Sequence, residues 1–525
     1  MPEEFHQPFN ASTWLVDRHV EGGDGDRLAV ISGDRTWTYA EVADEVAAAA
    51  AALRALGVEP EQRIAMAVLD SIEFVAGFLG AMRIGAVPVA MNPLLPGRDL
   101  GVITADARAR VAIVSAPMAD RVPGLCAAAP EVATVVSTGS ADQVDTGPSA
   151  ARVVGWSDFV ADGQPGDASP YPTWAESPGF WLCTSGSTGQ PKLAVHRHGD
   201  IRVTCETYAD QVLALTADDR CFSVGPMFHA YGLGNSLTFP FAAGASTVLE
   251  PTRPPTPALV ADLVTSHRPT LFFCIPTFYA ALNGSDLADD TFASVRLAAS
   301  AAEPLPAETY QRFNDRFGVT ILDGIGSTEL LHIYLSNTPS ALRPGTSGVP
   351  VPGYEVRVVD DEGNDQPRGE PGQLLVKGDS MTTGYWCRTS TNRATFDGPW
   401  MRTGDLYVAD ADGFHTYLGR VDDMLRVGGE WVSPAEVEGT LIEHERVLEA
   451  AVVGERDGAG ILRPIAYVIP ADGFDEQTDG AALTEELTGL CRERLAGFKR
   501  PRRYELVADL PKTATGKIQR FKLRS

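Results

Sequence analysis

A run of glycines and hydroxyl-bearing residues, TSGSTGQPK, occupies residues 184–192, directly after the apolar stretch GFWLC. Such small side chains bury too little surface for packing to explain them. Glycines at positive φ allow consecutive backbone N–H groups to converge on one anion, while the hydroxyls and the lysine add further donors. The spacing differs from the G-x-x-x-x-G-K-[ST] phosphate loop. The segment therefore predicts a polyphosphate-binding loop, with a flexible hydrophilic turn as the alternative.

Four more short motifs follow in order: GIGSTE (324–329), RTGDL (402–406), GRVDDM (419–424) and PKTATGK (511–517). Together with the first segment they resemble the motifs of the adenylate-forming superfamily, which contains acyl-CoA synthetases, carrier-protein adenylation domains and luciferases. The resemblance covers nearly the whole chain and implies two steps. A carboxylate attacks the α-phosphate of ATP and releases pyrophosphate, and a thiol then displaces AMP. Because the acid and ATP are both anions, catalysis would consist mainly of neutralising charge and aligning groups.

The resemblance assigns catalytic roles to four residues. Lys517 would bridge the substrate carboxylate and the α-phosphate, although a solvated lysine in a basic tail is the alternative. Glu329 would bind Mg²⁺, since a carboxylate beside phosphates is otherwise repulsive, and Thr328 would contact the α-phosphate. His229 would lie between the ATP side and the thiol tunnel, although a lone histidine is more often a core residue.

The resemblance also implies a nucleotide site. Asp405 would accept hydrogen bonds from the ribose hydroxyls, and Arg420 would reach the ribose or the phosphates. The adenine would lie between residues 300–304 and 323–326, with Ile325 where many relatives have a tyrosine. The full expected set is Thr184, Ser185, Gly186, Ser187, Thr188, Gly189, Lys192, Ala302, Glu303, Pro304, Asp323, Gly324, Ile325, Gly326, Asp405 and Arg420.

Two segments are expected to line the acid pocket: PMFHAYGLGNSLTFP (226–240) and DGIGSTELLHIYLSNTP (323–339). Both resemble benzoate-CoA and related aryl-CoA ligases more than fatty-acyl ligases, which implies an aromatic acid as substrate. The small residues in the first segment would equally admit a bulkier cyclic acid. The residues expected around the ring are Ala230, Tyr231, Gly234, His332 and Ile333.

The chain ends shortly after Lys517 without a fused carrier domain, so a separate thiol acceptor is expected, and local residues favour free coenzyme A. In RVGGEW (426–431), two glycines would let a pantetheine arm pass close to the backbone. The aromatic and basic residues of GFKRPRRY would hold its adenine and phosphates, with a solvated basic surface as the alternative. The expected set is Arg83, Gly428, Gly429, Trp431, Phe498 and Arg500.

Two rival functions remain open from the sequence: an enzyme that loads a carrier-protein thiol, and a non-catalytic adenylate-binding protein. The joint presence of Lys517, Glu329 and Asp405 argues against the second. Two departures from the family pattern also matter, since Leu193 and Ala302 stand where relatives mostly carry glycine. Each places a Cβ atom where the backbone would approach ATP, which is either accommodated or weakens adenylation.

The elements that must position these residues follow an α/β pattern in the first half of the chain. A capping box, Thr38 with Glu41, begins an Ala-rich helix that ends at Gly57, and residues 71–85 also have helical spacing. Apolar runs at 63–69, 87–91 and 111–115 predict buried parallel strands between helices, whereas residues 135–178 predict an irregular surface connection.

The second half of the chain changes character. Alternating residues from about 345 predict short antiparallel strands, a small β-barrel-like part of the large domain. A capped helix and a strand then begin a small α+β domain, whose mobility the resemblance implies. The expected domains are 1–419 and 425–525, joined by a hinge at 420–424 that turns about Asp422.

Composition limits the partners and the location. The 525 residues include 69 acidic and 43 basic ones, and the formal net charge of −26 argues against nucleic acid and anionic membranes as main partners. The N-terminus lacks the apolar core of a secretory signal, and no apolar stretch is long enough to span a membrane. Seven scattered cysteines suggest neither a disulfide framework nor zinc. A cytoplasmic protein is expected, with the oligomeric state open, a homodimer included.

Overall fold

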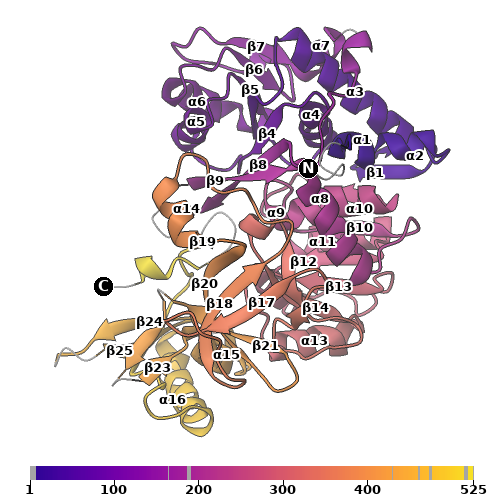
Figure 1. The fold of residues 1–525 in the computed structure, drawn as a ribbon. Coiled ribbons are helices and arrows are strands. Elements are labelled where there is room, and N and C mark those ends of the chain that lie inside the picture. Colours follow the sequence, from indigo (N-terminus) through magenta and orange to yellow (C-terminus); the bar gives the residue numbers. More distant parts are fainter. Residues whose placement is uncertain are drawn as a thin grey trace.

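The computed structural model describes residues 7–163, 165–185, 191–421, 423–427, 430–458, 462–471, 476–512 and 518–523. Two large sheets with flanking helices form the upper and middle parts of the molecule, and the C-terminal elements form the lower part (Figure 1). This arrangement confirms the expected fold, a large α/β domain with a smaller C-terminal domain that has its own sheet.

The first sheet has the strand order β7-β6-β5-β3-β4-β8-β9. All neighbouring strands are parallel except β8 and β9, which form an antiparallel pair at one edge. The capping box at Thr38 begins α3 as expected. The bounds are β3 (Arg63–Ala67), β4 (Val87–Ala90), β5 (Val111–Val114), β6 (Thr134–Ser137), β7 (Arg152–Gly155), β8 (Pro178–Ser185), β9 (Pro191–Arg197), α3 (Tyr39–Ala55), α4 (Ile72–Arg83), α5 (Gly97–Asp106), α6 (Val122–Ala128) and α7 (Trp156–Ala161).

The prediction of an irregular connection over residues 135–178 is wrong in part. Strand β6 covers its start, and β7 and α7 lie within it. The sequence RVVGWSDFVA is apolar enough to add an edge strand and a short helix, since Val154, Trp156 and Phe159 are buried. Surrounding glycines, serines and aspartates hid this short apolar signal, because strands of four residues have little periodicity to detect.

The second sheet has the order β16-β15-β14-β13-β12-β10-β11-β1-β2, parallel in its centre and antiparallel at both edges. The site described below uses β13, β14 and β15. The bounds are β1 (Leu28–Ser32), β2 (Arg35–Thr38), β10 (Arg220–Ser223), β11 (Ser246–Leu249), β12 (Leu271–Cys274), β13 (Leu297–Ser300), β14 (Ile321–Gly326), β15 (Ile333–Ser336) and β16 (Val349–Pro350).

The helices and helical turns around these sheets are short. The α-helices are α1 (Ala11–Leu15), α2 (Asp17–Glu21), α8 (His198–Thr204), α9 (Ala230–Leu233), α10 (Phe239–Ala243), α11 (Pro257–His267), α12 (Pro276–Asn283) and α13 (Ala307–Phe317). The π-helical turns are η5 (Cys205–Ala209) and η6 (Gly234–Thr238). The 3₁₀ turns are η2 (Ala116–Arg121), η3 (Ala141–Gln143), η4 (Pro165–Ala168), η7 (Thr328–Leu330) and η8 (Arg520–Lys522).

A third, antiparallel sheet of five strands follows, as the alternating sequence predicts. The C-terminal elements then pack around a separate hydrophobic core that includes Leu425, Val437, Val452 and Leu487. The bounds are β17 (Glu355–Val359), β18 (Pro371–Lys377), α14 (Thr389–Thr395), β19 (Phe396–Asp397), β20 (Trp400–Ala409), β21 (His415–Arg420), β22 (Leu425–Val427), β23 (Glu430–Val432), α15 (Pro434–Ile442), β24 (Val447–Arg456), β25 (Leu462–Pro470), α16 (Glu476–Arg494) and β26 (Arg503–Leu506). No helix in the described part of the chain is both long and apolar enough to cross a membrane.

Candidate active site

The β8–β9 hairpin carries the segment with which the sequence analysis began. The two strands pair as far as Ser185 and Pro191, so residues 186–190 join the ends of a hairpin. Thr184 lies in β8 opposite Lys192 in β9. The Nζ atom of Lys192 lies 4.4 Å from the centre of the Tyr385 ring, a cation–π distance. The hairpin thus directs the cation of Lys192 toward Tyr385.

Tyr385 connects Lys192 to Glu329. Its hydroxyl donates a hydrogen bond of 2.6 Å to Oε1 of Glu329. Burial, followed by the charge of Glu329, raises the pKa of Tyr385, so the phenol stays protonated and can donate. The structure therefore brings two expected site residues, one cationic and one anionic, to the same aromatic ring.

Glu329 belongs to η7, a turn that follows β14. Its backbone oxygen accepts a hydrogen bond of 2.7 Å from the amide of Thr382. A carboxylate oxygen is a ligand type that Mg²⁺ prefers, and Mg²⁺ is commonly held by one or two protein carboxylates together with substrate phosphates. No cluster of three or more histidine, cysteine, aspartate or glutamate side chains occurs among the described residues. Glu329 alone therefore fits a magnesium ion that is shared with a nucleotide.

Asp405 and Arg420, both predicted nucleotide-binding residues, face each other across the β20–β21 pair. Nη1 of Arg420 donates to Oδ1 of Asp405 at 2.9 Å and to the backbone oxygen of Thr403 at 2.8 Å. The Asp405 side chain is 9% exposed, whereas that of Arg420 is 44% exposed. The strand pair thus joins a buried carboxylate to a half-exposed guanidinium.

Tyr334 in β15 links the two halves of this site. Burial, followed by the charges of Asp405 and Glu329, raises its pKa. Its hydroxyl has no hydrogen-bond partner in the described part of the chain. Both carboxylates therefore lie near enough to Tyr334 for their charges to act on this buried phenol.

The two adenine-side segments leave adjacent parallel strands. Ser300 pairs with Asp323 where β13 meets β14, and the amide of Leu305 donates to Oδ2 of Asp323 at 3.4 Å. Burial raises the pKa of Asp323 to about 8. A hydrogen bond from Thr277 of α12 holds the Glu303 carboxylate. Residues 300–305 and β14 are thus tied together at the carboxyl edge of the sheet, where ligands of open α/β sheets commonly bind.

The other residues expected around the adenine lie at the same edge of the sheet. Gly324 and Gly326 pair closely with β15, where a Cβ atom on Gly326 would lie 2.5 Å from the His332 backbone oxygen. Ile325 is partly buried against the large core, and Pro304 is exposed.

The two departures from the family pattern differ in their structural consequences. Leu193 is buried in a hydrophobic cluster that includes Trp181 and Met91, so its side chain contributes to the core. Ala302 has a φ of 77°, a left-handed conformation that suits glycine. Of these two departures, Ala302 is therefore the one that carries a backbone cost.

Three expected acid-pocket residues, Tyr231, Gly234 and His332, contact one another. The Tyr231 and His332 ring centres are 5.5 Å apart. A Cβ atom on Gly234 would lie 2.5 Å from Cδ2 of His332, so this position requires glycine. Burial lowers the pKa of His332 to about 3, and neither ring nitrogen has a hydrogen-bond partner among the described residues. The imidazole is therefore neutral and adds aromatic surface.

The other members of this wall lie close by. Ala230 and Ile333 are buried, at the start of α9 and of β15 respectively. His229 is the residue before α9, and its ring packs edge-on against Phe228 with ring centres 4.7 Å apart. The geometry brings all five expected ring contacts and His229 onto neighbouring elements.

Arg83, which was expected at the coenzyme A site, makes contacts within the large domain. Its guanidinium donates to Asp17 at 2.6 Å and to the backbone oxygen of Ala168 at 2.6 Å, and its side chain is 12% exposed. These contacts join the N-terminal helices to α4 and leave little of the guanidinium for a phosphate. The structure supports a packing role.

The basic segment near the end of α16 is also engaged within its own domain. Arg500 donates to the backbone oxygens of Leu495 and Arg492 and so caps α16. Lys499 forms a 2.7 Å ion pair with Glu436, and Phe498 packs against the C-terminal core. These contacts hold the segment within the C-terminal domain.

Some expected residues lie outside the described part of the chain. They are Gly186, Ser187, Thr188 and Gly189 of the 184–192 segment, Asp422, Gly428, Gly429 and Lys517. The side chains of Ser185 and Trp431 are likewise outside it, although their backbones belong to β8 and β23.

Three residues that contact or approach the expected ones were not predicted from the sequence: Tyr385, Tyr334 and His196. Tyr385 follows a glycine in an unremarked GYW segment, and Tyr334 is one of many buried aromatics. His196 could have been noticed as the first histidine of the HRH sequence that follows Lys192. Its ring contacts Thr328, which is 132 positions away, and no local pattern predicts such a contact.

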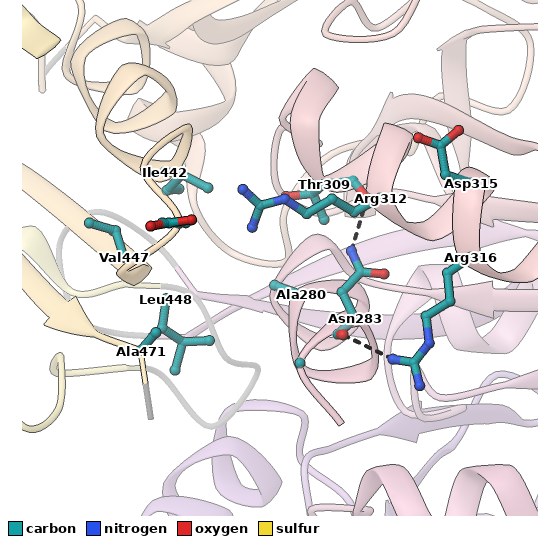
Figure 2. Close-up of a pocket in the computed structure, with 12 residues that line it drawn as sticks. Ala280, Asn283, Thr309, Arg312, Asp315, Arg316, Ile442, Val447, Leu448 and Ala471 are labelled. Atoms are coloured by element: carbon teal, nitrogen blue, oxygen red, sulfur yellow. Dashed lines mark hydrogen bonds between the residues drawn. The ribbon is translucent and has the colours of Figure 1, made fainter. Parts of the chain in front are cut away.

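A separate cleft of about 530 Å³ lies between the two domains. Figure 2 shows Ala280, Asn283, Thr309 and Arg312 of α12 and α13 on one side, and Ile442, Val447 and Leu448 on the other. None of the residues that line it belongs to the expected nucleotide or acid site. The cleft therefore reflects how the two domains lie against each other and is separate from the expected active site.

Two family models match most of the chain. Residues 16–386 match the family described as AMP-binding enzyme, and residues 436–517 match the AMP-binding enzyme C-terminal domain. The chain is 42% identical over 520 residues to a benzoate–CoA ligase of Thauera aromatica, covering 98% of this chain and 96% of that protein.

Two solved structures are similar over nearly the full length. One is the anthranilate CoA ligase AuaEII in complex with anthranoyl-AMP, with a TM-score of 0.91, 37% identity and coverage of 98% and 96%. The other is a benzoate CoA ligase from Burkholderia xenovorans LB400, with a TM-score of 0.89, 39% identity and coverage of 98% and 100%.

Proposed function

The chain belongs to the family of AMP-binding enzymes, and on this premise we propose that it activates a benzoate-like aromatic acid with ATP and transfers the acyl group to coenzyme A. The enzyme is an acid–thiol ligase. The observation that carries the proposal is the convergence of Lys192, Tyr385 and Glu329 on one side and Asp405 with Arg420 on the other. Cations and paired carboxylates around one centre suit a nucleotide whose α-phosphate is attacked by an acid.

The first half-reaction breaks the bond between the α- and β-phosphates and forms a mixed anhydride between the carboxylate and AMP. Lys192 and Arg420 supply positive charge to the polyphosphate, and Lys517 would bridge the carboxylate and the α-phosphate. Asp405 would orient the ribose by accepting its hydroxyl protons. A magnesium ion bound by Glu329 would neutralise phosphate charge. Electrostatic stabilisation of this kind commonly dominates phosphoryl chemistry.

The acid pocket supports an aromatic ring as the substrate's body. Tyr231, His332 and Phe239 present ring faces and edges, with the centres of His332 and Phe239 4.4 Å apart. A neutral, buried imidazole suits an apolar ring better than a second charge would. The carboxylate would then point toward the nucleotide side, since η7 and β15 follow one another directly in the chain.

The burial of Leu193 in the core removes one reason to expect feeble adenylation. A bulkier cyclic acid would have to displace the close contact between Gly234 and His332, which argues for a small ring. Coenzyme A is preferred over a carrier protein because the similar full-length relatives are named as CoA ligases.

The acceptor site and the domain motion are part of the proposal. The pantetheine arm would pass Gly428, Gly429 and Trp431, and the C-terminal domain would turn about Asp422 between the half-reactions. Neither nucleic acid nor membrane is expected as a partner at a net charge of −26. A cytoplasmic location and a homodimer remain compatible with these features.

A substrate screen tests this function. Benzoate, hydroxybenzoates, 2-aminobenzoate, cyclohexanecarboxylate and fatty acids are each incubated with ATP, Mg²⁺ and coenzyme A, and thioesters are measured by mass. The proposal predicts thioesters from the small aromatic acids, with AMP and pyrophosphate as co-products. Thioesters from fatty acids alone, or transfer only to a phosphopantetheine-bearing protein, would overturn it.

A further inference from the structure

The His196 side chain joins two motif-bearing segments through both of its ring nitrogens. Its Nδ1 lies 2.9 Å from Oδ2 of Asp200, and its Nε2 lies 2.8 Å from the backbone oxygen of Thr328. A carboxylate and a peptide carbonyl can only accept hydrogen bonds. Both ring nitrogens must therefore donate, which makes His196 an imidazolium in this geometry.

The charge of this imidazolium is balanced within the same cluster. Asp200 is fully buried and also accepts hydrogen bonds from the backbone amide of Arg197 at 3.0 Å and from its Nε at 2.9 Å. Arg197 in turn reaches Glu176 at 2.8 Å. Two cations and two carboxylates thus alternate, so that the buried charge of His196 is paired, as a stable buried ion requires.

Packing fixes the orientation of the ring. His196 has no exposed surface, and the Phe180 ring lies nearly parallel to it at an angle of 12°, with ring centres 5.1 Å apart. Phe180 in β8 is the strand partner of His196 in β9. The same hairpin that carries Lys192 therefore holds the imidazolium against η7.

The turn that receives this hydrogen bond is anchored at three successive carbonyls. The Thr328 oxygen accepts from His196, the Glu329 oxygen from the Thr382 amide at 2.7 Å, and the Leu330 oxygen from Ser380 at 2.7 Å. The last two donors are neutral, and His196 provides the charge-assisted bond, which is the strongest type. It is also the bond that ties the turn to the β8–β9 hairpin.

We propose that His196 is a positioning residue for adenylation: as a buried imidazolium held by Asp200, it fixes Thr328 and Glu329 relative to the hairpin that carries Lys192. The proposal rests on the proposed function, since Thr328 and Glu329 serve the first half-reaction there. Removing the charged bond would let η7 shift against the hairpin, and small displacements of aligned groups cost large factors in rate. The second half-reaction, in which the thiol attacks a completed adenylate, depends less on this alignment.

The test compares His196→Gln with the control His198→Gln by two assays. His198 is also fully buried and lies two residues away, but its Nδ1 accepts a hydrogen bond from the Ala11 amide at 3.1 Å and burial lowers its pKa to about 3. Acid-dependent pyrophosphate exchange measures adenylation, and thioester formation from supplied acyl-AMP measures transfer. We expect His196→Gln to lower kcat for exchange about 30-fold with acid KM changed less than about threefold, and acyl transfer nearly unchanged. His198→Gln should keep both half-reactions within about threefold of the unmodified enzyme.

A spectroscopic measurement on the unmodified enzyme keeps the proposal falsifiable if His196→Gln does not fold. With ¹⁵N-labelled histidine near neutral pH, the His196 resonances should show two protonated ring nitrogens, whereas His198 should show one. The His196 resonances are identified through Asp200→Asn, which perturbs them selectively. A singly protonated His196, or equal losses in both half-reactions that His198→Gln reproduces, would overturn the proposal. Absence of acid-dependent exchange in the unmodified enzyme would instead refute the proposed function and leave the protonation result standing.

Discussion

Ala302 adopts a left-handed backbone conformation, with φ at 77°, beside the expected nucleotide site. A residue with a Cβ atom is strained there by about 1 kcal/mol relative to glycine. We predict that Ala302→Gly raises the free energy of unfolding by about 1 kcal/mol in urea titrations. The neighbouring Ala301, which is buried and is not among the positive-φ residues, supplies the control, and Ala301→Gly should destabilise the protein. Equal effects of the two substitutions would contradict this account of position 302.

Asp323 should make stability depend on pH in the absence of ligand. Burial raises its pKa to about 8 in the folded protein, whereas an exposed aspartate titrates near about 4. Between these values the folded state holds a proton that the unfolded state has released, so the free energy of unfolding falls as pH rises, by at most about 1.4 kcal/mol per pH unit. Below this window the stabilisation is fully present, and it is lost as pH passes about 8.

Asp323→Asn removes this titration and keeps an oxygen to accept from the Leu305 amide. We predict that the difference in unfolding free energy between Asp323→Asn and the unmodified protein grows steadily in favour of asparagine from about pH 4 to pH 8. Chemical denaturation at several pH values measures it. Parallel stability curves would show that the carboxyl group is already ionised in the folded protein across this window.

At the scale of elements, the chain on either side of residues 513–517 is anchored to the C-terminal domain. Lys512 forms a 2.7 Å ion pair with Glu449 of β24, and it bridges to Ile518 across this segment. Arg520 donates to both Glu438 oxygens of α15, at 2.7 and 2.9 Å, and these side chains are 23% and 10% exposed. The described residues that flank Lys517 in the sequence are therefore each held by an ion pair to the C-terminal domain.

Arg520→Met should remove one of these ion pairs. We predict a loss of about 2 kcal/mol in C-terminal domain stability, because Glu438 is left as a buried charge without its cation, and about tenfold slower pyrophosphate exchange. Glu438→Gln in the same chain removes that charge and still accepts from the Val452 amide, so the double variant should regain stability. Thermal unfolding and exchange assays decide the matter. Unchanged exchange in Arg520→Met would show that this anchor does not position Lys517.

The sequence predicts elements well where local signals coincide. The capping box at Thr38 and Glu41, strands within 63–69, 87–91 and 111–115, and the capped helix after Ser433 all appear in the structure. The missed strand β7 is short and surrounded by turn residues. Contacts such as His196 with Thr328 depend on how β9 meets a turn 132 positions later, and only the assembled sheets determine them.

The site residues also differ in how far the sequence could predict their contacts. Asp405 and Arg420 are brought together by a strand pair, which the ordered motifs implied, and Tyr231, Gly234 and His332 share one wall. Arg83 was expected at the coenzyme A site from the family resemblance, and Arg500 from the aromatic and basic residues around it. The structure instead uses their guanidinium groups to satisfy carbonyls and Asp17, partners that a linear sequence does not reveal.

At the scale of the whole molecule, the interdomain cleft tests whether the two domains must move. Arg312 of the large domain and Glu445 of the C-terminal domain both line it. The test uses Arg312→Cys and Glu445→Cys together, in a background in which the exposed Cys387 is replaced by serine. A bis-maleimide that joins the two new cysteines would hold the domains in the present arrangement. We predict that overall thioester formation falls more than about tenfold while one half-reaction survives. Each single-cysteine variant serves as a control, and full turnover in the tethered enzyme would contradict the hinge at 420–424.

The central claim is that the acid is joined to AMP before it meets the thiol, and isotope transfer tests it most directly. An aromatic acid labelled with ¹⁸O in its carboxylate is converted to its CoA thioester, and the nucleotide product is analysed by mass spectrometry. We predict that AMP acquires one labelled oxygen from each turnover. In the acyl-adenylate, one carboxylate oxygen is bonded to the α-phosphate. That oxygen leaves with AMP when the thiol attacks the acyl carbon. Unlabelled AMP, or ADP with label in inorganic phosphate, would contradict the account.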